Sequence, residues 1–131
     1  MYEYVLLYNL SSEQKSRLTR MFLIMKVHMI FVEPSQYGKS IGQLLGKEDM
    51  MPSLEAFAEA EQEKDALNTS MMVMYGFNNA RLDALLKGLR KNQVPPIALK
   101  AIVTPSNITW TSLQLYRELQ KEHAAFQNRR S

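Results

Sequence analysis

Cysteine is absent from this sequence of 131 residues. Its absence excludes a disulfide scaffold, a thiolate metal site and a thiol nucleophile, and it fits a reducing compartment. Long apolar runs are absent too, because no stretch approaches the roughly 20 residues that a membrane-spanning helix needs. The chain opens on a strand-like run without the charged, apolar and small-residue pattern of a signal peptide. We therefore expect a cytoplasmic protein with no membrane partner.

Residues suited to catalysis or metal binding are few. The two histidines, His28 and His123, are far apart in the sequence and have no third ligand nearby, so no metal site is expected. The segment GQLLGK at 42–47 lacks the glycine spacing of a P-loop and the Ser or Thr that follows it. No dinucleotide pattern and no nucleophilic triad can be assembled. These absences predict no cofactor and no catalytic residues, and they favour a role other than catalysis.

Four strand-like runs each end in a polar turn that opens a helix, and two of these stretches share letters. Residues 30–44 read IFVEPSQYGKSIGQL, and residues 101–115 read AIVTPSNITWTSLQL. The first and third runs, YVLLYNL and MMVMYGF, share a Tyr near their ends. The sequence therefore predicts two strand-helix-strand-helix units, at 1–45 and 71–127, joined by an acidic connector helix at 46–70.

The fold class follows from this alternation of strands and helices. Strands that are apolar on both faces are typical of a sheet covered by helices. We predict one α/β domain over residues 1–131, with four mainly parallel strands and helices on both faces. The alternative is an α+β ferredoxin-like duplication with extra helices, which would send the two pairs of turns to opposite ends of the sheet.

Helix signals flank the strands. Ser11 with Gln14 forms a capping-box pattern for the helix that follows the first strand. Asn78 or Asn79 is suited to cap the helix that follows the third strand. Asn92 is expected to end that helix in the left-handed conformation. Apolar residues expected to face inward are Leu54, Phe57, Ala58 and Leu67 in the connector, and Leu82, Leu85, Leu86 and Leu89 in the helix at 79–92.

The candidate site depends on strand direction. If all four strands point the same way, the turns at 8–9, 33–35, 75–78 and 104–107 gather at the carboxyl edge of the sheet, where open α/β sheets bind ligands. Helix N-termini at that edge would offer N–H groups to an anion. The other interpretation is structural: Ser, Thr and Asn cap helices, and glycine satisfies the backbone. The predicted ligand or partner surface consists of Tyr75, Gly76, Phe77, Asn78, Thr104, Ser106, Asn107 and Trp110.

Charge is unevenly distributed, with five acidic residues against one lysine at 53–67 and nine basic residues against three acidic ones from Arg81 onward. We favour a binding or regulatory module, with a nucleic-acid binder as an alternative. A phospholigand binder or small enzyme at the helix N-termini is a third possibility. Protein partners include a second copy, because Met50-Met51 and Met71-Met72 could place soft side chains near a surface. The basic residues of the nucleic-acid alternative are Arg81, Lys87, Arg90 and Lys91.

The second half, roughly 71–123, also carries two short motifs. Met74-Tyr75-Gly76-Phe77 ends the third run, and Thr104-Pro105-Ser106-Asn107 follows the fourth, with Trp110 close behind. These motifs resemble those of a bacterial family of domains of unknown function, the one numbered thirty-seven eighty-three. The first half departs from them, with LYNL and EPSQ at the corresponding places. The resemblance implies a small bacterial, cytoplasmic protein, and it brings no activity or cofactor.

Overall fold

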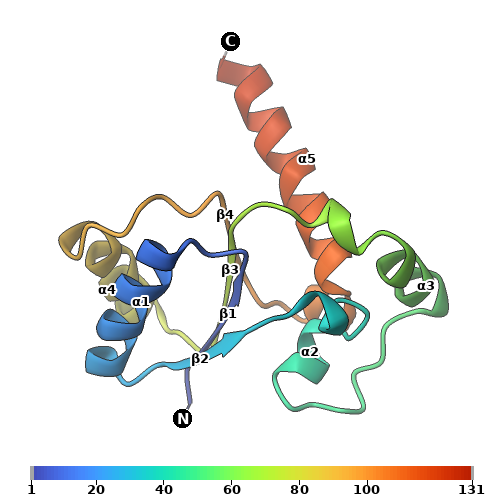
Figure 1. Cartoon of the computed structure of the whole chain (residues 1–131), viewed down its shortest axis with the longest axis horizontal. Coiled ribbons are helices and arrows are strands. Elements are labelled where there is room, and N and C mark those ends of the chain that lie inside the picture. The colour runs from blue at the N-terminus through green and yellow to red at the C-terminus, as the bar shows by residue number, and fades with distance from the viewer. Residues whose placement is uncertain (1, 131) are drawn as a thin grey trace. The chain divides into compact units, whose positions relative to one another are not determined.

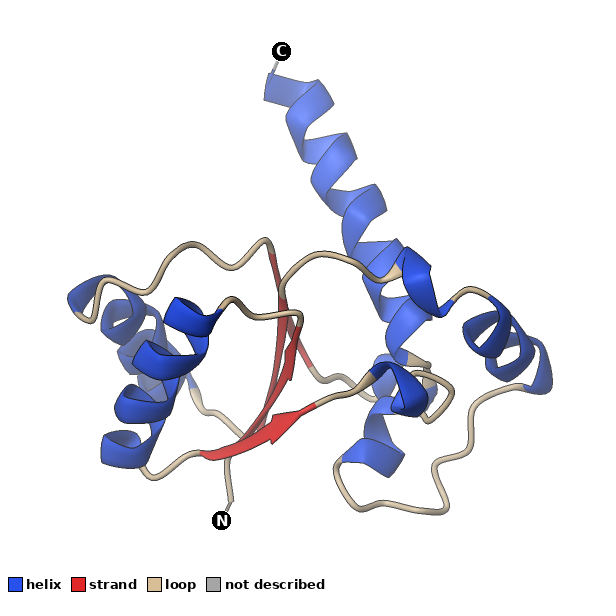
Figure 2. Cartoon of the chain, in the orientation of Figure 1, coloured by secondary structure: helices blue, strands red, loops and turns tan. Residues whose placement is uncertain are grey.

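The computed structural model describes residues 2–130, with side chains described as far as Ala124. Its strands are β1 (Tyr4–Tyr8), β2 (His28–Phe31), β3 (Met71–Tyr75) and β4 (Leu99–Ile102) (Figure 1). Its helices are α1 (Ser12–Met25), α2 (Ile41–Leu44), α3 (Leu54–Gln62), α4 (Asn79–Lys91) and α5 (Ser112–Arg130) (Figure 2). Short 3-10 helices occur at Pro34–Gln36 (η1), Lys64–Ala66 (η2) and Asn107–Thr109 (η3). None of the helices within the described residues is long and apolar enough to cross a membrane.

The four strands form one sheet in the order β2-β1-β3-β4. The outer pairs, β1 with β2 and β3 with β4, are parallel, and each is joined through a helix, α1 or α4. The central pair, β1 with β3, is antiparallel. The prediction of a small α/β domain with a mainly parallel four-stranded sheet is thereby confirmed.

The expectation that all four strands point the same way is wrong. Tyr4 pairs with Tyr75, and Tyr8 pairs with Met71, so β1 and β3 run in opposite directions. The carboxyl ends of β1 and β2 therefore lie at one edge of the sheet, and those of β3 and β4 lie at the other. A long connection separates β2 from β3, and its sequence does not specify the end of the sheet at which it returns. Because each parallel pair is adjacent, neither strand-helix-strand unit is split as the ferredoxin-like alternative requires.

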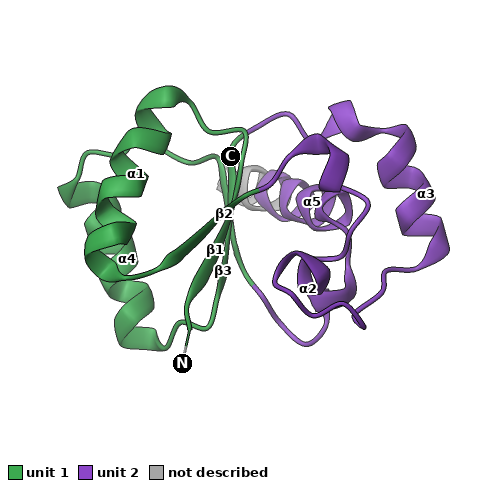
Figure 3. Ribbon diagram, turned by 60° about the horizontal axis from the view of Figure 1, so that its bottom comes forward, with its two compact units in different colours: residues 1–31, 70–102 green, residues 32–69, 103–131 purple. Residues whose placement is uncertain are grey.

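The chain forms two compact units, and both take residues from both halves of the sequence (Figure 3). Unit 1 consists of Met1–Phe31 and Ser70–Ile102 and contains the sheet with α1 and α4. Unit 2 consists of Val32–Thr69 and Val103–Ser131 and contains α2, α3 and α5. These units cut across the repeat units expected at 1–45 and 71–127, whose boundaries stay a prediction.

The two halves nevertheless correspond in register. Met71 of β3 stands 67 positions after Tyr4 of β1, and Leu99 of β4 stands 71 positions after His28 of β2. Tyr4 pairs with His28 as Met71 pairs with Leu99. The increase from 67 to 71 shows that the second strand-helix-strand unit is four residues longer, because its connection is five residues longer and its helix is one residue shorter. That connection runs over 92–98 in the second half and over only Lys26 and Val27 in the first.

The core of unit 1 lies between the sheet and the two helices α1 and α4, which occupy the same face (Figure 1). Alternate residues of β1 and β3, Val5 and Leu7 with Met72 and Met74, point toward this face. They pack with Leu18, Met21, Phe22 and Leu85 from the helices. Met71 and Met72 are fully buried, so the expectation that they contribute to a surface for self-association is wrong.

Unit 2 buries Tyr37, Ile41, Leu113 and Tyr116. Arg117 of α5 forms ion pairs with Glu59 of α3 and, at 3.2 Å, with Glu63 just after it, so part of the acidic charge of α3 faces a basic side chain.

The expected inward face of the connector helix is partly wrong. Ala56 and Ala60 are the buried residues of α3, whereas Leu54 is 86% exposed and Phe57 is 46% exposed. The helix buries Ala56 and Ala60 because small residues allow close packing, whereas its large apolar residues and Ala58, also expected to face inward, lie outward. Leu67 is buried as expected.

Candidate functional site

The turn at Thr104–Asn107 is closed by its own side chains. The Thr104 backbone N–H donates to Asn107 Oδ1 at 2.9 Å, and the Asn107 backbone N–H donates to Thr104 Oγ1 at 3.1 Å. The corresponding turn of the first half repeats half of this pattern, because Glu33 N–H donates to Gln36 Oε1 at 2.9 Å. The polar atoms that predicted a ligand surface here thus hold the turn itself.

The corner at Tyr75–Asn78 also has structural roles. Gly76 has a φ of 88°, and a Cβ at this position would lie 2.5 Å from the carbonyl oxygen of Tyr2. Asn78 Oδ1 accepts from the backbone N–H of Arg81 at 2.8 Å and so caps α4, and Phe77 packs against the core of unit 1. Both properties of Gly76, the positive φ and the close approach, exclude a side chain there.

The eight predicted surface residues are divided between the two units. Tyr75, Gly76, Phe77 and Asn78 belong to unit 1, and Thr104, Ser106, Asn107 and Trp110 belong to unit 2. Trp110 lines a hollow of about 240 Å³ together with Glu59, Gln114, Arg117, Glu118 and Lys121. The Trp110 carbonyl oxygen accepts from Ile41 N–H at 2.9 Å, beside an antiparallel bridge between Ser40 and Thr111.

The helix N-termini, which were expected to receive an anion, are capped. Ser11, Ser40, Ser53, Asn78 and Thr111 each accept a bond from a first-turn backbone N–H of α1, α2, α3, α4 or α5. Three of these caps are reciprocal, with Gln14, Gln43 and Gln114 bonding back to the cap backbone. Side chains thus take up N–H groups that a phosphate would need.

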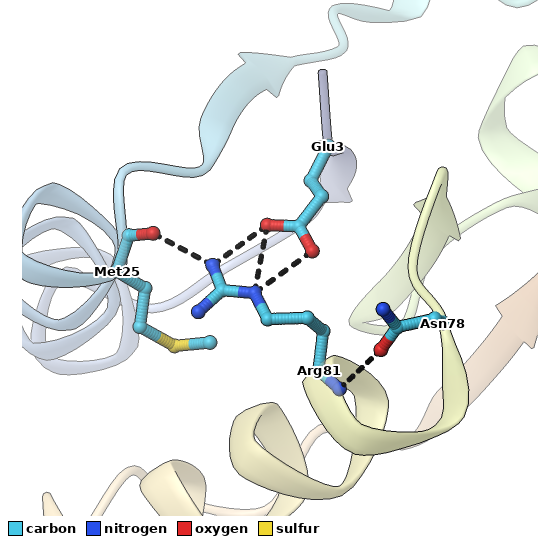
Figure 4. A network of polar contacts seen from close by, with 4 residues as sticks. All are labelled: Glu3, Met25, Asn78 and Arg81. Atoms are coloured by element: carbon cyan, nitrogen blue, oxygen red, sulfur yellow. Dashed lines mark hydrogen bonds and ion pairs between the residues drawn. The ribbon is translucent and has the colours of Figure 1, made fainter. Parts of the chain in front are cut away.

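Arg81 is held in a polar network within unit 1 (Figure 4). Its Nε and Nη2 atoms donate to the Glu3 carboxylate at 2.9 and 2.7 Å, and Nη2 also donates to the Met25 carbonyl oxygen at 2.7 Å. The hydrogen bonds that Arg81 donates to the Glu3 carboxylate raise the pKa of Arg81, so the guanidinium keeps its charge. Arg81 thereby connects α4 to β1 and to the end of α1, which leaves it poorly suited to contact nucleic acid.

The other residues of the predicted basic surface differ in their surroundings. Lys87 forms an exposed ion pair with Asp83 at 3.0 Å. Arg90 and Lys91 are exposed in the last turn of α4, where positive charge is favoured by the helix dipole. Arg90 also borders a groove that the sequence interpretation did not identify.

This groove lies entirely within unit 1 and has a volume of about 470 Å³. Its walls come from the last turns of α4, from the connection that follows and from the start of the edge strand β4. A volume of this size is typical of sites for small organic ligands. The apolar lining residues are Leu86, Leu89, Val94, Pro95, Pro96 and Ile97, and the polar ones are Arg90, Gln93 and Lys100.

The extra residues of the second half form the wall of the groove. The helix ends at Lys91, and Gln93, rather than the expected Asn92, adopts the left-handed conformation, with a φ of 53°. The two prolines then restrict the backbone. Since the first half has only two residues at the corresponding place, the same wall cannot form there. Leu86, expected to be buried, is 37% exposed because it faces the groove.

Side chains from α1 hold this connection in place. Gln14 Nε2 donates to the carbonyl oxygens of Pro95 and Pro96 at 3.2 and 3.0 Å. Arg17 Nη1 donates to the Asn92 carbonyl oxygen at 3.1 Å. Gln14 is buried, so its amide satisfies two carbonyl groups with few water contacts. The groove is therefore preformed rather than made by a loose loop.

Two cations border the groove. Lys100 pairs with Met72 in the register of β4, which places it on the same face of the sheet as α4. Arg90 contributes from the helix side. The pocket thus combines an apolar body with two positive groups, and no acidic residue is among its described lining residues. Sequence reasoning identified Arg90 for a different reason and did not select Lys100.

An aromatic row crosses the sheet in unit 1. The Tyr4 ring stacks on His28 with centroids 4.9 Å apart and lies 6.4 Å from the Tyr75 ring. Tyr2 meets His28 edge-on at 5.4 Å. Tyr4, His28 and Tyr75 are cross-strand neighbours, so this part of the row follows from strand register, which the sequence alone does not provide. In the described part of the chain, no cluster of three or more acidic or histidine side chains is placed to hold a metal ion.

Known proteins give one comparison. Residues 70–126 match a family model, described as Domain of unknown function (DUF3783). The DUF3783 match confirms the resemblance for this segment, which runs from just before β3 into α5 and contains every lining residue of the groove. No curated protein and no solved structure matches the chain.

Proposed function

We propose that the protein is a non-enzymatic binding module whose ligand site is the groove between the end of α4 and β4. The observation that carries the proposal is a preformed apolar pocket of about 470 Å³ bordered by Arg90 and Lys100. This site lies at the start of β4 rather than at the strand carboxyl ends, where the sequence placed it. The surface predicted at those ends stays a prediction.

The chemistry of the lining defines the ligand class. Leu86, Leu89 and Ile97 provide a surface for an apolar body. The hydrophobic effect contributes about 25 cal/mol of binding free energy for each Å² of apolar surface that is buried. Arg90 and Lys100 favour an anionic head group. A small amphipathic anion, such as a medium-chain carboxylate, satisfies both requirements. An uncharged ligand of the same length would offer Arg90 and Lys100 no opposite charge, although Lys100 Nζ would keep its hydrogen bond to the Ile97 carbonyl oxygen at 3.4 Å.

Calorimetric titration of the full chain tests the proposal. Octanoate and decanoate are compared with the primary alcohols of the same chain lengths. We expect the carboxylates to bind at one site per chain and the alcohols to bind at least tenfold more weakly. A tenfold difference corresponds to about 1.4 kcal/mol, which is within reach of two partly exposed charge contacts.

Variants locate the site. Arg90→Met and Lys100→Met remove the charge but keep an apolar stem, and each is expected to weaken carboxylate binding about fivefold, or about 1 kcal/mol. Lys91→Met is the matched control, because Lys91 lies in the same helical turn but does not line the groove. Equal affinities for carboxylates and alcohols, or equal effects of the three substitutions, would contradict the proposal.

A further inference from the structure

A second surface, in unit 2, concentrates exposed apolar side chains. Met51 is 65% exposed, Leu54 is 86% exposed and Phe57 is 46% exposed. Together with Pro52, Gly38, Lys39 and Gln43 they line a hollow of about 300 Å³. We call the three exposed residues Met51, Leu54 and Phe57 the α3 patch. It takes no part in the groove proposed above, because all of its residues belong to the other compact unit.

The exposure of the α3 patch is not a consequence of poor helix packing. Ser53 caps α3, with its Oγ accepting from Ala56 N–H at 3.1 Å, and Ala56 and Ala60 bury the opposite face. Phe57 approaches Gly38 so closely that a Cβ there would lie 3.0 Å from the ring. Residues 46–53, which lead into the helix, are anchored by Ser40 Oγ, which donates to the Met50 carbonyl oxygen. The patch is therefore a formed surface on a fixed frame.

Acidic residues are chain neighbours of the α3 patch. Glu48 and Asp49 precede Met51 in the chain, Glu55 follows Leu54, and all three are exposed. The Glu61 carboxylate lies beside Phe57, since a Cβ on Gly38 would be 2.7 Å from its Oε1, although Lys64 pairs with it at 3.1 Å. Lys39 is the basic residue among those lining the hollow. Lys47 precedes Glu48, so these segments carry four acidic side chains, Glu48, Asp49, Glu55 and Glu61, against Lys39, Lys47 and Lys64, which is a net charge of −1.

We infer that the α3 patch is a docking surface for a basic amphipathic helix of a partner protein. Apolar side chains three or four positions apart on such a helix would enter the hollow, and flanking Lys or Arg side chains would face Glu48, Asp49 and Glu55. Methionine suits such a role because its flexible thioether adapts to side chains of different shape. Charge complementarity selects a basic partner over an acidic one.

The test uses fluorescence anisotropy with the full chain and three synthetic peptides. One carries Leu at helical spacing and Lys elsewhere, the second replaces Lys by Glu, and the third has the composition of the first with the Leu spacing scrambled. We expect the first peptide to bind at least tenfold more tightly than either of the others. Equal binding of the scrambled peptide would show that nonspecific charge attraction alone explains the binding, and it would overturn the inference.

Substitutions locate the contact. Met51→Ser and Leu54→Ser are each expected to weaken binding at least fivefold, and Glu55→Lys is expected to weaken it as well. Leu23→Ser and Ile24→Ser are matched controls, because these residues are 69% and 77% exposed on α1 in unit 1. Circular dichroism verifies that each variant is folded. An affinity unchanged by Leu54→Ser, or lowered equally by Ile24→Ser, would overturn the inference.

Sedimentation of the full chain without peptide distinguishes a second copy from a basic partner. A monomer that binds the basic peptide supports the inference. A dimer that Leu54→Ser converts to monomer, together with no binding of the basic peptide, would assign the patch to self-association instead and would overturn it.

Discussion

Two glycines show how a single residue can be fixed by its surroundings. Gly76 and Gly46 both have a left-handed backbone, with φ values of 88° and 92°. A Cβ on Gly76 would collide with the Tyr2 carbonyl oxygen, whereas a Cβ on Gly46 would meet nothing within 4 Å. The glycine of the MYGF motif therefore serves a close backbone approach as well as a turn.

This comparison gives the first prediction. Gly46→Ala is expected to lower the free energy of unfolding by about 1 kcal/mol, the cost of a left-handed backbone for a residue with a side chain. Gly76→Ala is expected to cost about 2–4 kcal/mol, because the backbone must also move away from Tyr2. Urea denaturation of both variants measures the difference. Equal losses of unfolding free energy in the two variants would show that the close approach of Gly76 to the Tyr2 carbonyl oxygen adds nothing to the cost of the substitution.

Arg81 gives the second prediction. Arg81→Met removes hydrogen bonds to Glu3 and Met25, and because Arg81 is partly exposed the expected loss of unfolding free energy is about 1–2 kcal/mol. Lys87→Met, which removes an exposed ion pair from the same helix, is expected to cost under about 0.5 kcal/mol.

The pH dependence of the Arg81 contribution follows from the direction of its shift. A pKa raised by folding means that the stabilisation is present below the ordinary pKa of arginine and is lost only above it. The loss in Arg81→Met should therefore be the same at neutral and mildly alkaline pH. Denaturation curves at both pH values check this, and a loss that fades between them would contradict the assignment.

At the residue scale, the sequence predicted helix caps that the structure contains. Ser11 and Asn78 cap their helices as their positions before apolar stripes indicate. Lys100 was not recognised as a groove residue because its role depends on which face of β4 meets α4. That face is set by the pairing of Lys100 with Met72, a contact far apart in sequence.

The connection between α4 and β4 is the most informative element. Gln14 fills two roles at once: its Oε1 caps α1 through Ser11 N–H at 2.8 Å, and its Nε2 holds Pro95 and Pro96. The sequence revealed the first role through the capping-box pattern. It did not reveal the second, because the acceptors are more than eighty positions away.

Gln14→Glu separates these roles and gives the third prediction. A carboxylate can still accept from Ser11 N–H, since Glu is common at this capping position. It cannot donate to the two proline carbonyl oxygens and repels them, so we expect a loss of about 1–3 kcal/mol and faster amide exchange at 92–98. Ser11→Ala removes the cap hydroxyl and should leave exchange at 92–98 unchanged. Similar exchange in both variants would contradict the anchoring role.

Strand direction shows the limit of element-level prediction. The two parallel pairs could be expected from strand-helix-strand patterns, whose crossovers favour parallel neighbours. The antiparallel pairing of β1 with β3 could not be expected, because the sequence from Phe31 to Ser70 does not indicate at which end of the sheet the chain returns. One unresolved direction was enough to place the carboxyl ends of β2 and β4 at different edges of the sheet.

At the scale of the whole molecule, the chain crosses between its two units three times, after Phe31, Thr69 and Ile102. Each unit therefore needs both halves of the sequence. The order of elements in the sequence could not predict this interleaving, because it assigns each half of the chain to a repeat unit of its own. Composition and periodicity identified the class of fold but could not show how segments from the two halves combine.

The fourth prediction follows from this interleaving. Residues 1–69 and 70–131, produced separately, are each expected to be unfolded by circular dichroism. Produced together, they are expected to copurify when one carries an affinity tag, because the β1–β3 pairing rejoins them. Stable, cooperative unfolding of the 1–69 fragment alone would contradict the dependence of each unit on both halves.

The four-residue difference between the halves also bears on the stoichiometry of the ligand binding that we propose. Two equal halves arranged about a common axis would present every feature twice, as the two chains of a symmetric dimer do. The short α1–β2 link removes that duplication at one place, so the groove that we propose as a ligand site is expected to saturate at one small anion per polypeptide.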